Sequence, residues 1–265
     1  MKSDFDIIRW KLPDGEVRIY PIADVHFGAI NHNSVAWTRF CNKVAADPSA
    51  YLILDGDLLN NNTRSSVGSP WDDTIRPREA KKMMVEYLEP LKDKILCMTS
   101  GNHERRSLKD ADDDPTYDIA CKLDIEDVYR QNAAFVKVSI GDRTKGKGRP
   151  HEPKITYHIA VTHGAGGGIY TGATVNRNER WGNVIDGVDC VIVGHTHKGT
   201  VTRPSKLVID QRNNVVTVQE YVVISCVAWQ DYSEYAMQKM LLPCRTAKPQ
   251  TLVLNPNEKE IAVLW

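Results

Sequence analysis

The sequence predicts an α/β protein that ends in a β-rich tail. Short, continuously apolar runs alternate with helix-like segments through the first two thirds of the 265-residue chain. Uninterrupted apolar strands separated by helices are typical of a sheet that is buried on both faces. After His197 the helical pattern stops, and strand-like runs follow one another in pairs. The composition, with 42% apolar and 26% charged residues, is ordinary for a globular protein and supplies enough apolar residues for a core.

The first part of the chain contains five predicted strands and two predicted helices. The strands are expected at 17–22, 51–54, 94–100, 155–163 and 189–195. Asn33 or Ser34 is a suitable N-cap for the first helix. The second helix is expected from about 78 to 88 and ends near Pro90, because proline cannot continue a helix.

In the tail, four strand-like runs are expected to form two hairpins. The runs 206–210 and 215–226 flank an Asn-Asn dipeptide, which favours a tight hairpin turn. The runs 251–254 and 261–265 flank the segment NPNEKE, which is rich in turn-forming residues. The tail is therefore expected to be antiparallel.

Charge, cysteine content and hydropathy narrow the class of protein. The 34 basic residues balance 34 acidic ones, which excludes a uniformly basic protein that coats nucleic acid. The six cysteines form no CxxC pair and lie partly within apolar runs, so we expect buried thiols and a reducing, cytoplasmic location. The first ten residues do not form a signal peptide, and no run approaches the ~20 apolar residues of a membrane helix. We therefore expect no membrane association.

One segment is locally basic although the net charge of the chain is zero. Residues 141–154 (GDRTKGKGRPHEPK) contain five Lys or Arg and two acidic residues. Two interpretations are open. The segment is either a solvated hairpin loop or a basic finger that contacts phosphate backbones.

The placement of histidine is the most informative feature of the sequence. Five polar clusters lie directly after predicted strands, next to glycine or an acid. They are Asp24-x-His26, Gly56-Asp57, Gly101-Asn102-His103-Glu104, Thr162-His163-Gly164 and Gly194-His195-Thr196-His197. In an open α/β sheet, ligands bind in the crevice beyond the carboxyl ends of the strands. We therefore expect the five clusters to converge on one place.

The side chains in these clusters are oxygen and nitrogen donors for a metal ion. Carboxylate, imidazole and carboxamide donors without a thiolate suit divalent ions such as Mn²⁺, Fe²⁺, Zn²⁺ or Ni²⁺. The candidate donors are Asp24, His26, Asp57, Asn102, His163, His195 and His197. They are too many for one tetrahedral ion, whereas two ions that share a bridging carboxylate would use them all.

The charge at such a site favours an anionic substrate. Two divalent ions carry four positive charges, two aspartates remove two of them, and a bridging hydroxide removes one more. The neutral imidazoles and the Asn carbonyl leave the remaining positive charge in place. Two such ions about 3.5–4 Å apart can generate hydroxide and hold the phosphoryl oxygens of an in-line displacement. The expected substrate is therefore a phosphate ester.

In this order, the motifs D-x-H, G-D, G-N-H-E, T-H-G and G-H-T-H resemble those of the calcineurin-like metallophosphoesterase superfamily, especially its stand-alone bacterial or phage-type members. They span Asp24 to His197, about two thirds of the chain. The resemblance implies a four-layer α/β sandwich in which two central mixed β-sheets are flanked by helices. It also implies a single domain over 1–265, whose β-rich tail 200–265 completes the second sheet.

The resemblance also assigns roles to individual residues. It implies two metal ions, one bound by Asp24, His26, Asp57 and His197 and the other by Asp57, Asn102, His163 and His195. Asp57 would bridge them, and Mn²⁺ is expected, with Fe, Zn or Ni as alternatives. The catalytic residue it implies is His103, which would contact the phosphate and protonate the leaving oxygen. The other interpretation of His103 is that it only hydrogen-bonds a ligand carboxylate.

The residues after His103 have their own interpretations. Glu104 is expected to cap or pair locally rather than to take part in catalysis. Arg105 and Arg106 either direct a guanidinium to the substrate phosphate or are solvated arginines at the start of a helix. The glycine-rich stretch 164–168 is expected to let the backbone approach the metal centre.

The expected function is metal-dependent hydrolysis of phosphate esters, with phosphodiesters preferred and with nucleotides or nucleic acids among the candidate substrates. The alternative is a DNA exonuclease or endonuclease of the double-strand-break-repair type, which Arg105, Arg106 and the basic 141–154 segment favour. The zero net charge and the 68 residues left after His197 argue against it, since those nucleases carry an added capping domain. A non-catalytic metal-binding module is a third reading, and the intact His103 argues against that.

Overall fold

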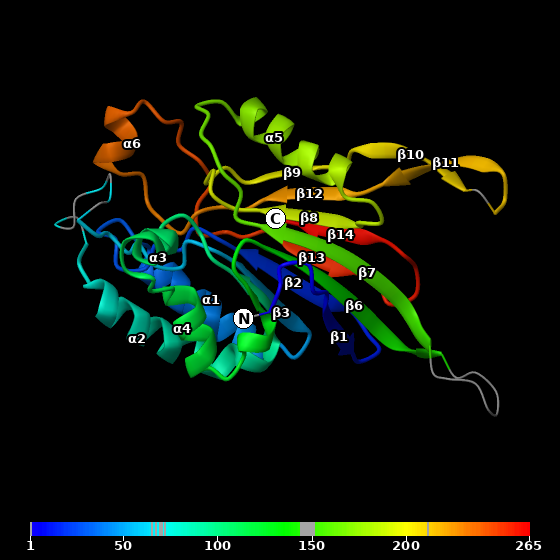
Figure 1. The fold of residues 1–265 in the computed structure, drawn as a ribbon, viewed down its shortest axis with the longest axis horizontal. Coiled ribbons are helices and arrows are strands. Elements are labelled where there is room, and N and C mark those ends of the chain that lie inside the picture. Colours follow the sequence, from blue (N-terminus) through cyan, green and yellow to red (C-terminus); the bar gives the residue numbers. More distant parts are fainter. Residues whose placement is uncertain are drawn as a thin grey trace.

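Two six-stranded mixed β-sheets form the centre of the molecule, and helices cover their outer faces (Figure 1). The computed structural model describes residues 2–64, 66, 68, 71, 73–143, 152–210 and 212–265. The predicted α/β fold with two central mixed sheets flanked by helices is confirmed.

Sheet I, as we name the first of the two, has the strand order β1-β6-β7-β8-β12-β9. Its strands are β1 (Ile8–Leu12), β6 (Ala133–Arg143), β7 (Glu152–Thr162), β8 (Cys190–Val193), β12 (Val222–Ser225) and β9 (Thr200–Thr202). Strands β7, β8 and β12 run parallel to one another. Their carboxyl ends therefore lie at one edge of the sheet.

Sheet II has the strand order β14-β13-β2-β3-β4-β5. Its strands are β14 (Ile261–Leu264), β13 (Thr251–Leu254), β2 (Val17–Ile22), β3 (Ala50–Asp55), β4 (Ile95–Thr99) and β5 (Tyr129–Arg130). Strands β2 to β5 are parallel, and every residue of β4 is buried. This continuous burial is what a sheet covered on both faces requires.

The helices form where their local sequence favours them. They are α1 (Ser34–Ala46), α2 (Pro77–Leu88), η2 (Glu89–Lys94), α3 (Glu104–Ala111), α4 (Pro115–Lys122), η3 (Glu126–Val128), α5 (Thr171–Val184) and α6 (Glu234–Gln238). Asn33 caps α1, because its side chain accepts a hydrogen bond from the Ala36 backbone N–H at 3.0 Å. Within the described part of the chain, none of the helices is long and apolar enough to cross a membrane.

The main core lies between the two sheets, and further apolar clusters lie between each sheet and its helices. Residues of both sheets, such as Ile53 and Val138, meet in the central cluster. Cys97, Cys190 and Cys226 belong to it as free, buried thiols. Burial raises the pKa of all three thiols, so they are unreactive packing groups.

The tail 200–265 supplies strands to both sheets. β9 and β12 extend sheet I, whereas β13 and β14 extend sheet II. The run 215–226, expected as one strand, is two strands with different partners. β11 (Val215–Glu220) pairs antiparallel with β10 (Ser205–Asp210), as expected. β12 enters sheet I parallel to β8, so the expectation of an antiparallel tail is wrong for this strand. Tyr221 separates them, because its buried ring and the bond from its hydroxyl to Asn183 Oδ1 at 2.8 Å anchor the chain at the core.

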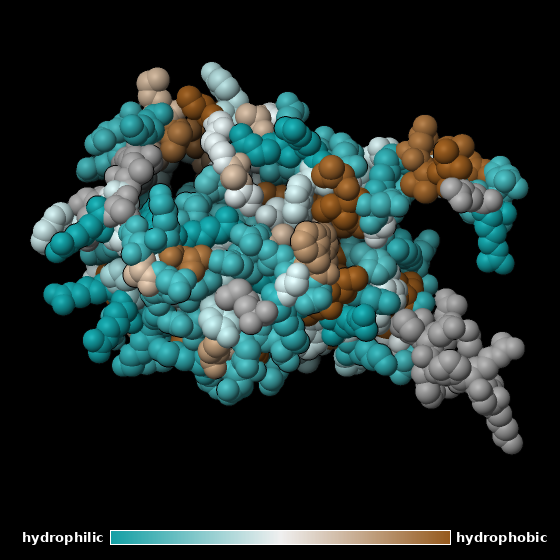
Figure 2. All heavy atoms as spheres, in the orientation of Figure 1, coloured by the Kyte–Doolittle hydropathy of each residue, from teal (hydrophilic) through white to brown (hydrophobic). Residues whose placement is uncertain are grey.

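The β10–β11 hairpin projects from the body of the molecule (Figure 1). Its register pairs Leu207 with Val218 and Ile209 with Val216, which places four apolar side chains on one face. Each of the four is at least 61% exposed. Figure 2 shows this face as a brown patch near one end of the molecule.

The basic segment 141–154 lies largely outside the described residues, because 144–151 are not described. Its described ends belong to β6 and β7, at the end of β7 opposite Thr162. β7 has 11 residues, and a strand rises about 3.3 Å per residue, so its two ends are about 30 Å apart. The described Lys154 forms an ion pair with Asp14 at that far edge. The ends of the segment are therefore remote from the edge at which the histidine motifs lie.

Candidate metal centre

The seven donor residues predicted from the sequence all follow the carboxyl ends of strands, at one edge of the sandwich. They are Asp24 and His26 after β2, Asp57 after β3, Asn102 after β4, His163 after β7, and His195 and His197 after β8. Sheet II and sheet I both contribute, so neither sheet alone could form this cluster. The structure brings all seven together in two groups, and a third group of possible ligands, made of His26, Asp57 and His103, connects them.

The first group contains Asp24, His26 and His197, whose ligand atoms lie within 4.8 Å of one another. The Nε2 atoms of His26 and His197 are 3.0 Å apart. Asp24 Oδ1 is 3.2 Å from His197 Nε2 and 3.8 Å from His26 Nε2. The His195 backbone N–H donates to Asp24 Oδ2 at 2.9 Å. This bond fixes the carboxylate so that its other oxygen faces the imidazoles.

The second group contains Asp57, His163 and His195, together with the carboxamide of Asn102. Asp57 Oδ2 is 3.2 Å from His163 Nε2. Asn102 Oδ1 is 3.2 Å from His163 Nε2 and 2.6 Å from His195 Nδ1. His163 Nδ1 lies 2.7 Å from the Asp55 carbonyl oxygen, to which it donates. That bond holds the ring with Nε2 towards Asp57.

Asp57 connects the two groups. Its Oδ2 atom, which faces His163, is also 3.9 Å from His26 Nε2. The same oxygen is 3.9 Å from His103 Nε2, and Oδ1 accepts a hydrogen bond from the His103 backbone N–H at 2.8 Å. One carboxylate oxygen thus faces both groups.

The backbone at this edge adopts conformations that residues with side chains rarely take. The φ angle is positive at Asp24 (55°), His26 (49°), Asp57 (50°), His195 (69°) and His197 (58°). Such conformations cost of the order of 1–3 kcal/mol each and persist where the surrounding structure enforces them. Glycine would relieve this strain, so the presence of Asp and His at these positions indicates that the site needs their side chains.

Two glycines let the loops after β3 and β4 touch. A Cβ atom on Gly101 would collide with the carboxylate and the backbone nitrogen of Asp57. Gly56 has φ of 74°, and a Cβ there would collide with the backbone of Gly101. The glycines of the G-D and G-N-H-E motifs are therefore required by close approach and, at Gly56, by a left-handed conformation.

Glu104 has a larger part in the site than the local cap or pair expected from the sequence. It is fully buried, and its carboxylate accepts hydrogen bonds from the backbone N–H groups of Asp57 (2.9 Å), Leu59 (2.9 Å) and Gly101 (3.0 Å). Burial and the negative charge of Asp57 raise the pKa of Glu104 to about 7, although the hydrogen bonds from Leu59 and Gly101 act to lower it. The carboxylate ties the loop after β3 to the loop after β4. The only sequence signal for this role was an acid next to the donor motif.

His103 lies beside both groups at the start of α3. Its Nδ1 is 2.6 Å from the Asn60 carbonyl oxygen, which assigns the ring proton to Nδ1 and leaves Nε2 towards Asp57. Arg106 Nη2 is 3.0 Å from His103 Nε2, and Arg106 Nη1 donates to Asn62 Oδ1 at 2.9 Å. Burial lowers the pKa of His103, against the raising effect of Asp57. Arg106 is half-buried, and its guanidinium contacts His103 and Asn62.

The charges within the centre suit a bound cation. Burial acts to lower the pKa of His163, but Asp57 outweighs it and raises that pKa well above its ordinary value. Burial also holds the pKa of His26 well below its ordinary value, so its imidazole is neutral. A divalent ion binds neutral imidazole and would displace the proton of His163.

The donor set fits a divalent ion. Asp24 Oδ1 is buried and accepts no hydrogen bond, although it faces two imidazoles. A buried carboxylate oxygen without a partner is costly, and a cation among these donors would supply one. The set offers nitrogen and oxygen atoms only, which suits divalent ions of hard or borderline character rather than soft metals.

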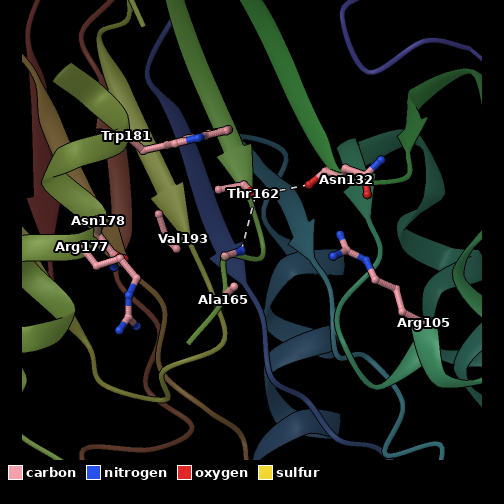
Figure 3. A pocket seen from close by; sticks show the side chains of 9 residues that line it. Arg105, Asn132, Thr162, Ala165, Arg177, Asn178, Trp181 and Val193 are labelled. Atoms are coloured by element: carbon pink, nitrogen blue, oxygen red, sulfur yellow. Dashed lines mark hydrogen bonds between the residues drawn. The ribbon is translucent and has the colours of Figure 1, made fainter. Parts of the chain in front are cut away.

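A pocket of about 350 Å³ lies at the carboxyl ends of β7 and β8, and none of the seven donors is among its described lining residues (Figure 3). Thr162 and Gly164, which flank His163, line it, and so does Val193 at the end of β8. Arg105 lines this pocket as well, and its Nη2 donates to the carbonyl oxygens of Ser100 and Gln131, each at 3.3 Å. The two neighbouring arginines thus have different surroundings: Arg105 lines the pocket, and Arg106 contacts His103.

Two mixed sheets with Asp, His and Asn donors gathered at the carboxyl ends of their strands define a metal-binding α/β protein. A family model described as calcineurin-like phosphoesterase matches residues 17–199, more than half of the chain, and the chain belongs to this family. The expected resemblance is thereby confirmed. The protein is a metal-dependent phosphoesterase, a hydrolase that acts on phosphate esters with divalent metal ions.

Two solved structures are similar to this chain. One is a conserved protein of Streptococcus pneumoniae TIGR4 described as a predicted phosphoesterase, with 10% identity, a TM-score of 0.38, and coverage of 94% of this chain and 90% of the other. The second is a metallophosphoesterase from Sphaerobacter thermophilus, with 15% identity, a TM-score of 0.42, and coverage of 93% and 87%. No curated protein matches the chain.

Proposed function

We propose that the protein is a dinuclear phosphodiesterase. In this proposal one cation is held by Asp24, His26, Asp57 and His197, and the other by Asp57, Asn102, His163 and His195. Mn²⁺ is the proposed metal, because the donors are imidazole nitrogens and carboxylate or carboxamide oxygens. Bound divalent cations lower the pKa of a water and offset the charge of phosphoryl oxygens.

The observation that carries the proposal is the position of Asp57. Its Oδ2 lies 3.2 Å from His163 Nε2 in one donor group and 3.9 Å from His26 Nε2 in the other. A carboxylate shared by two donor sets is what two neighbouring cations need. Glu104 and Gly101 support the assignment, since both hold the backbone of Asp57 in place.

His103 is the proposed proton donor to the leaving oxygen. Its Nδ1–H is held by the Asn60 carbonyl oxygen, so Nε2 is the atom available to the substrate. In the structure Arg106 donates to that nitrogen, which matches a neutral imidazole. Donation from Nε2 therefore requires a second proton on the ring, and Arg106 then turns to the phosphate oxygens, which suit a guanidinium fork.

The preference for diesters rests on the space beside the centre. A diester carries a second substituent on its phosphate, and the pocket lined by Thr162, Gly164 and Val193 is next to the donor strands. The two arginines in its lining, Arg105 and Arg177, suit an ester that bears a further anionic group.

The proposal also treats residues 1–265 as one domain. The tail strands β9 and β12 lie in sheet I and β13 and β14 in sheet II, so both sheets need the tail. The unfolding of the whole chain in urea should then be a single transition by fluorescence and by circular dichroism. Two separate transitions would contradict a single domain.

The experiment that tests the function is a matched pair of aryl substrates assayed with Mn²⁺. We expect hydrolysis of an aryl phosphodiester to exceed that of the corresponding monoester, and EDTA to abolish both reactions. Elemental analysis of the desalted enzyme should give close to two metal ions per chain. A strong monoester preference would overturn the diester assignment, and a single ion at full activity would overturn the dinuclear one.

A further inference from the structure

The pocket beside the centre has two chemically different ends. We name it the α5 pocket, and the lining residues used below are Arg105, Thr162, Arg177, Asn178 and Trp181. Figure 3 shows Trp181 at the upper end and the two arginines lower down on either side. No carboxylate belongs to the described lining, so its formal charge is positive. The pocket therefore offers an aromatic surface at one end and an anion site at the other.

Asn178 places a buried amide without a hydrogen-bond partner at the α5 pocket. The residue lies in the middle of α5 and is only 3% exposed. Its side-chain Nδ2 is buried and has no hydrogen-bond partner among the described residues. A buried amide without a partner costs free energy that a leucine of similar size would not. A ligand with an acceptor atom in the pocket would satisfy this donor.

The two arginines are held in place by the protein rather than by solvent. Arg177 donates to the carbonyl oxygens of Gly166 and Gly167 at 2.9 and 3.0 Å. The Nε atom of Arg105 is buried and also without a partner. Each guanidinium carries five N–H donors, so donors remain for an anion. Asn178 and Arg105 both line this pocket, and each carries a buried N–H donor without a partner among the described residues.

Trp181 supplies the aromatic surface. Its ring stacks on Phe135, with the centroids 6.3 Å apart and the planes inclined by 18°. This contact fixes the orientation of the indole, so a planar ligand group would meet a preformed surface. Inorganic phosphate alone would leave that end of the 350 Å³ pocket unused, because pockets of this size hold small organic molecules.

We propose that the α5 pocket binds a nucleoside phosphate unit of the substrate. The base lies against Trp181, an acceptor atom of the nucleotide receives the Asn178 amide, and its phosphate lies between Arg105 and Arg177. The inference rests on the proposed phosphodiesterase function. Thr162 and Gly164 line the pocket and flank His163 in the sequence, so in this proposal the nucleotide binds at the same strand ends that carry the metal donors. The substrate class is thereby a nucleotide-containing phosphodiester.

The test is nucleotide binding without metal, which separates the pocket from catalysis. The full-length protein in EDTA is titrated with AMP, ribose 5-phosphate and inorganic phosphate at constant ionic strength, and binding is followed by calorimetry. We expect AMP to bind at least about tenfold more tightly than ribose 5-phosphate, since base stacking contributes measurably to affinity. The dinucleotide pApA forms a further arm, and tighter binding of pApA than of AMP would assign the source to an oligonucleotide. Equal binding of all four compounds would overturn the proposal.

Variants of α5 sharpen the test. Asn178→Leu should weaken AMP binding by about tenfold or more, because a hydrogen bond to an anionic ligand is lost. The same change should leave the melting temperature equal or higher, because an unpartnered buried amide is removed. A lower melting temperature would show that Asn178 has a structural role, and unchanged AMP binding would show that its amide does not contact the nucleotide. The matched control is Asn176→Leu, an exposed position on the same helix, which should change neither property.

Trp181→Leu distinguishes the aromatic end from the anion end. It should remove the preference for AMP over ribose 5-phosphate while the affinity for ribose 5-phosphate stays within about twofold. If the enzyme hydrolyses an aryl diester with Mn²⁺ but binds no AMP in EDTA, the nucleotide inference fails and the phosphodiesterase proposal stands. If AMP binds but no aryl ester is hydrolysed, the proposed function fails and the binding site stands.

Discussion

Replacing Glu104 tests whether this buried carboxylate positions the centre. It accepts backbone hydrogen bonds from Asp57, Leu59 and Gly101, and each buried N–H that loses its acceptor costs about 1–3 kcal/mol. Glu104→Ala leaves all three buried N–H groups without an acceptor. The substitution also removes the cost of burying the carboxylate, which raises the pKa of Glu104 to about 7. We therefore expect the free energy of unfolding to fall by an amount at the lower end of the sum, about 3–4 kcal/mol at pH 8.

The conservative variant Glu104→Gln should lose less stability than Glu104→Ala. Glu104→Gln keeps one oxygen, which can still accept from Asp57 and Gly101, so only the Leu59 N–H loses its partner. The expected loss is about 1–2 kcal/mol. Urea unfolding in EDTA measures both values, and both variants should fold because a domain of this kind has about 5–15 kcal/mol of stability. Glu86→Ala is the control, since Glu86 is exposed and only faces Lys82 at 3.8 Å.

A positioning role also predicts a loss of metal. The loop that carries Asp57 is no longer tied to the loop that carries Asn102, so Glu104→Ala should bind less Mn²⁺ than Glu104→Gln, as elemental analysis after desalting would show. The reasoning is refuted if the two variants are equally stable, or if Glu104→Ala retains as much metal as the unmodified protein.

Three other substitutions test the site. Asp57→Asn should reduce bound metal well below two ions per chain in elemental analysis, because a shared ligand is lost by both proposed cations. His103→Asn should retain the metal but lower kcat by roughly 10²–10⁴, with a smaller defect for an aryl ester, whose leaving group departs without a proton, than for a natural ester. Gly101→Ala should unfold at lower urea and bind less metal, because its Cβ would collide with Asp57, whereas Gly172→Ala on α5 meets no atom within 4 Å and should be neutral or stabilising.

Each of these has an outcome that contradicts it. Two ions retained with full activity in Asp57→Asn would remove the bridging assignment. Equal losses of kcat on aryl and natural esters in His103→Asn would leave phosphate stabilisation as its role, and metal loss would make it a ligand. A stable Gly101→Ala protein with normal metal content would show that the two loops do not need their close approach.

The sequence was sufficient for the elements that local chemistry decides. The continuous apolar runs of β3 and β4 and the hairpin turn between 210 and 215 depend on neighbours in the chain and were predicted, as was a helix cap at Asn33 or Ser34. The run 215–226 was not, because its division at Tyr221 depends on a contact with Asn183 in α5. The strand-like pattern of 215–226 does not reveal that its first half will pair with β10 and its second half with β8.

The same distinction holds for the site. The order of Asp, His and Asn motifs after apolar runs was enough to indicate where seven donors lie, since the carboxyl ends of parallel strands share an edge. The chain alone did not show that Glu104 holds three backbone N–H groups, that Arg105 and Arg106 point to different places, or that Asn178 has a buried donor without a partner. Those facts arise from contacts between segments distant in sequence, and burial, which only the packed structure produces, makes each of them matter energetically.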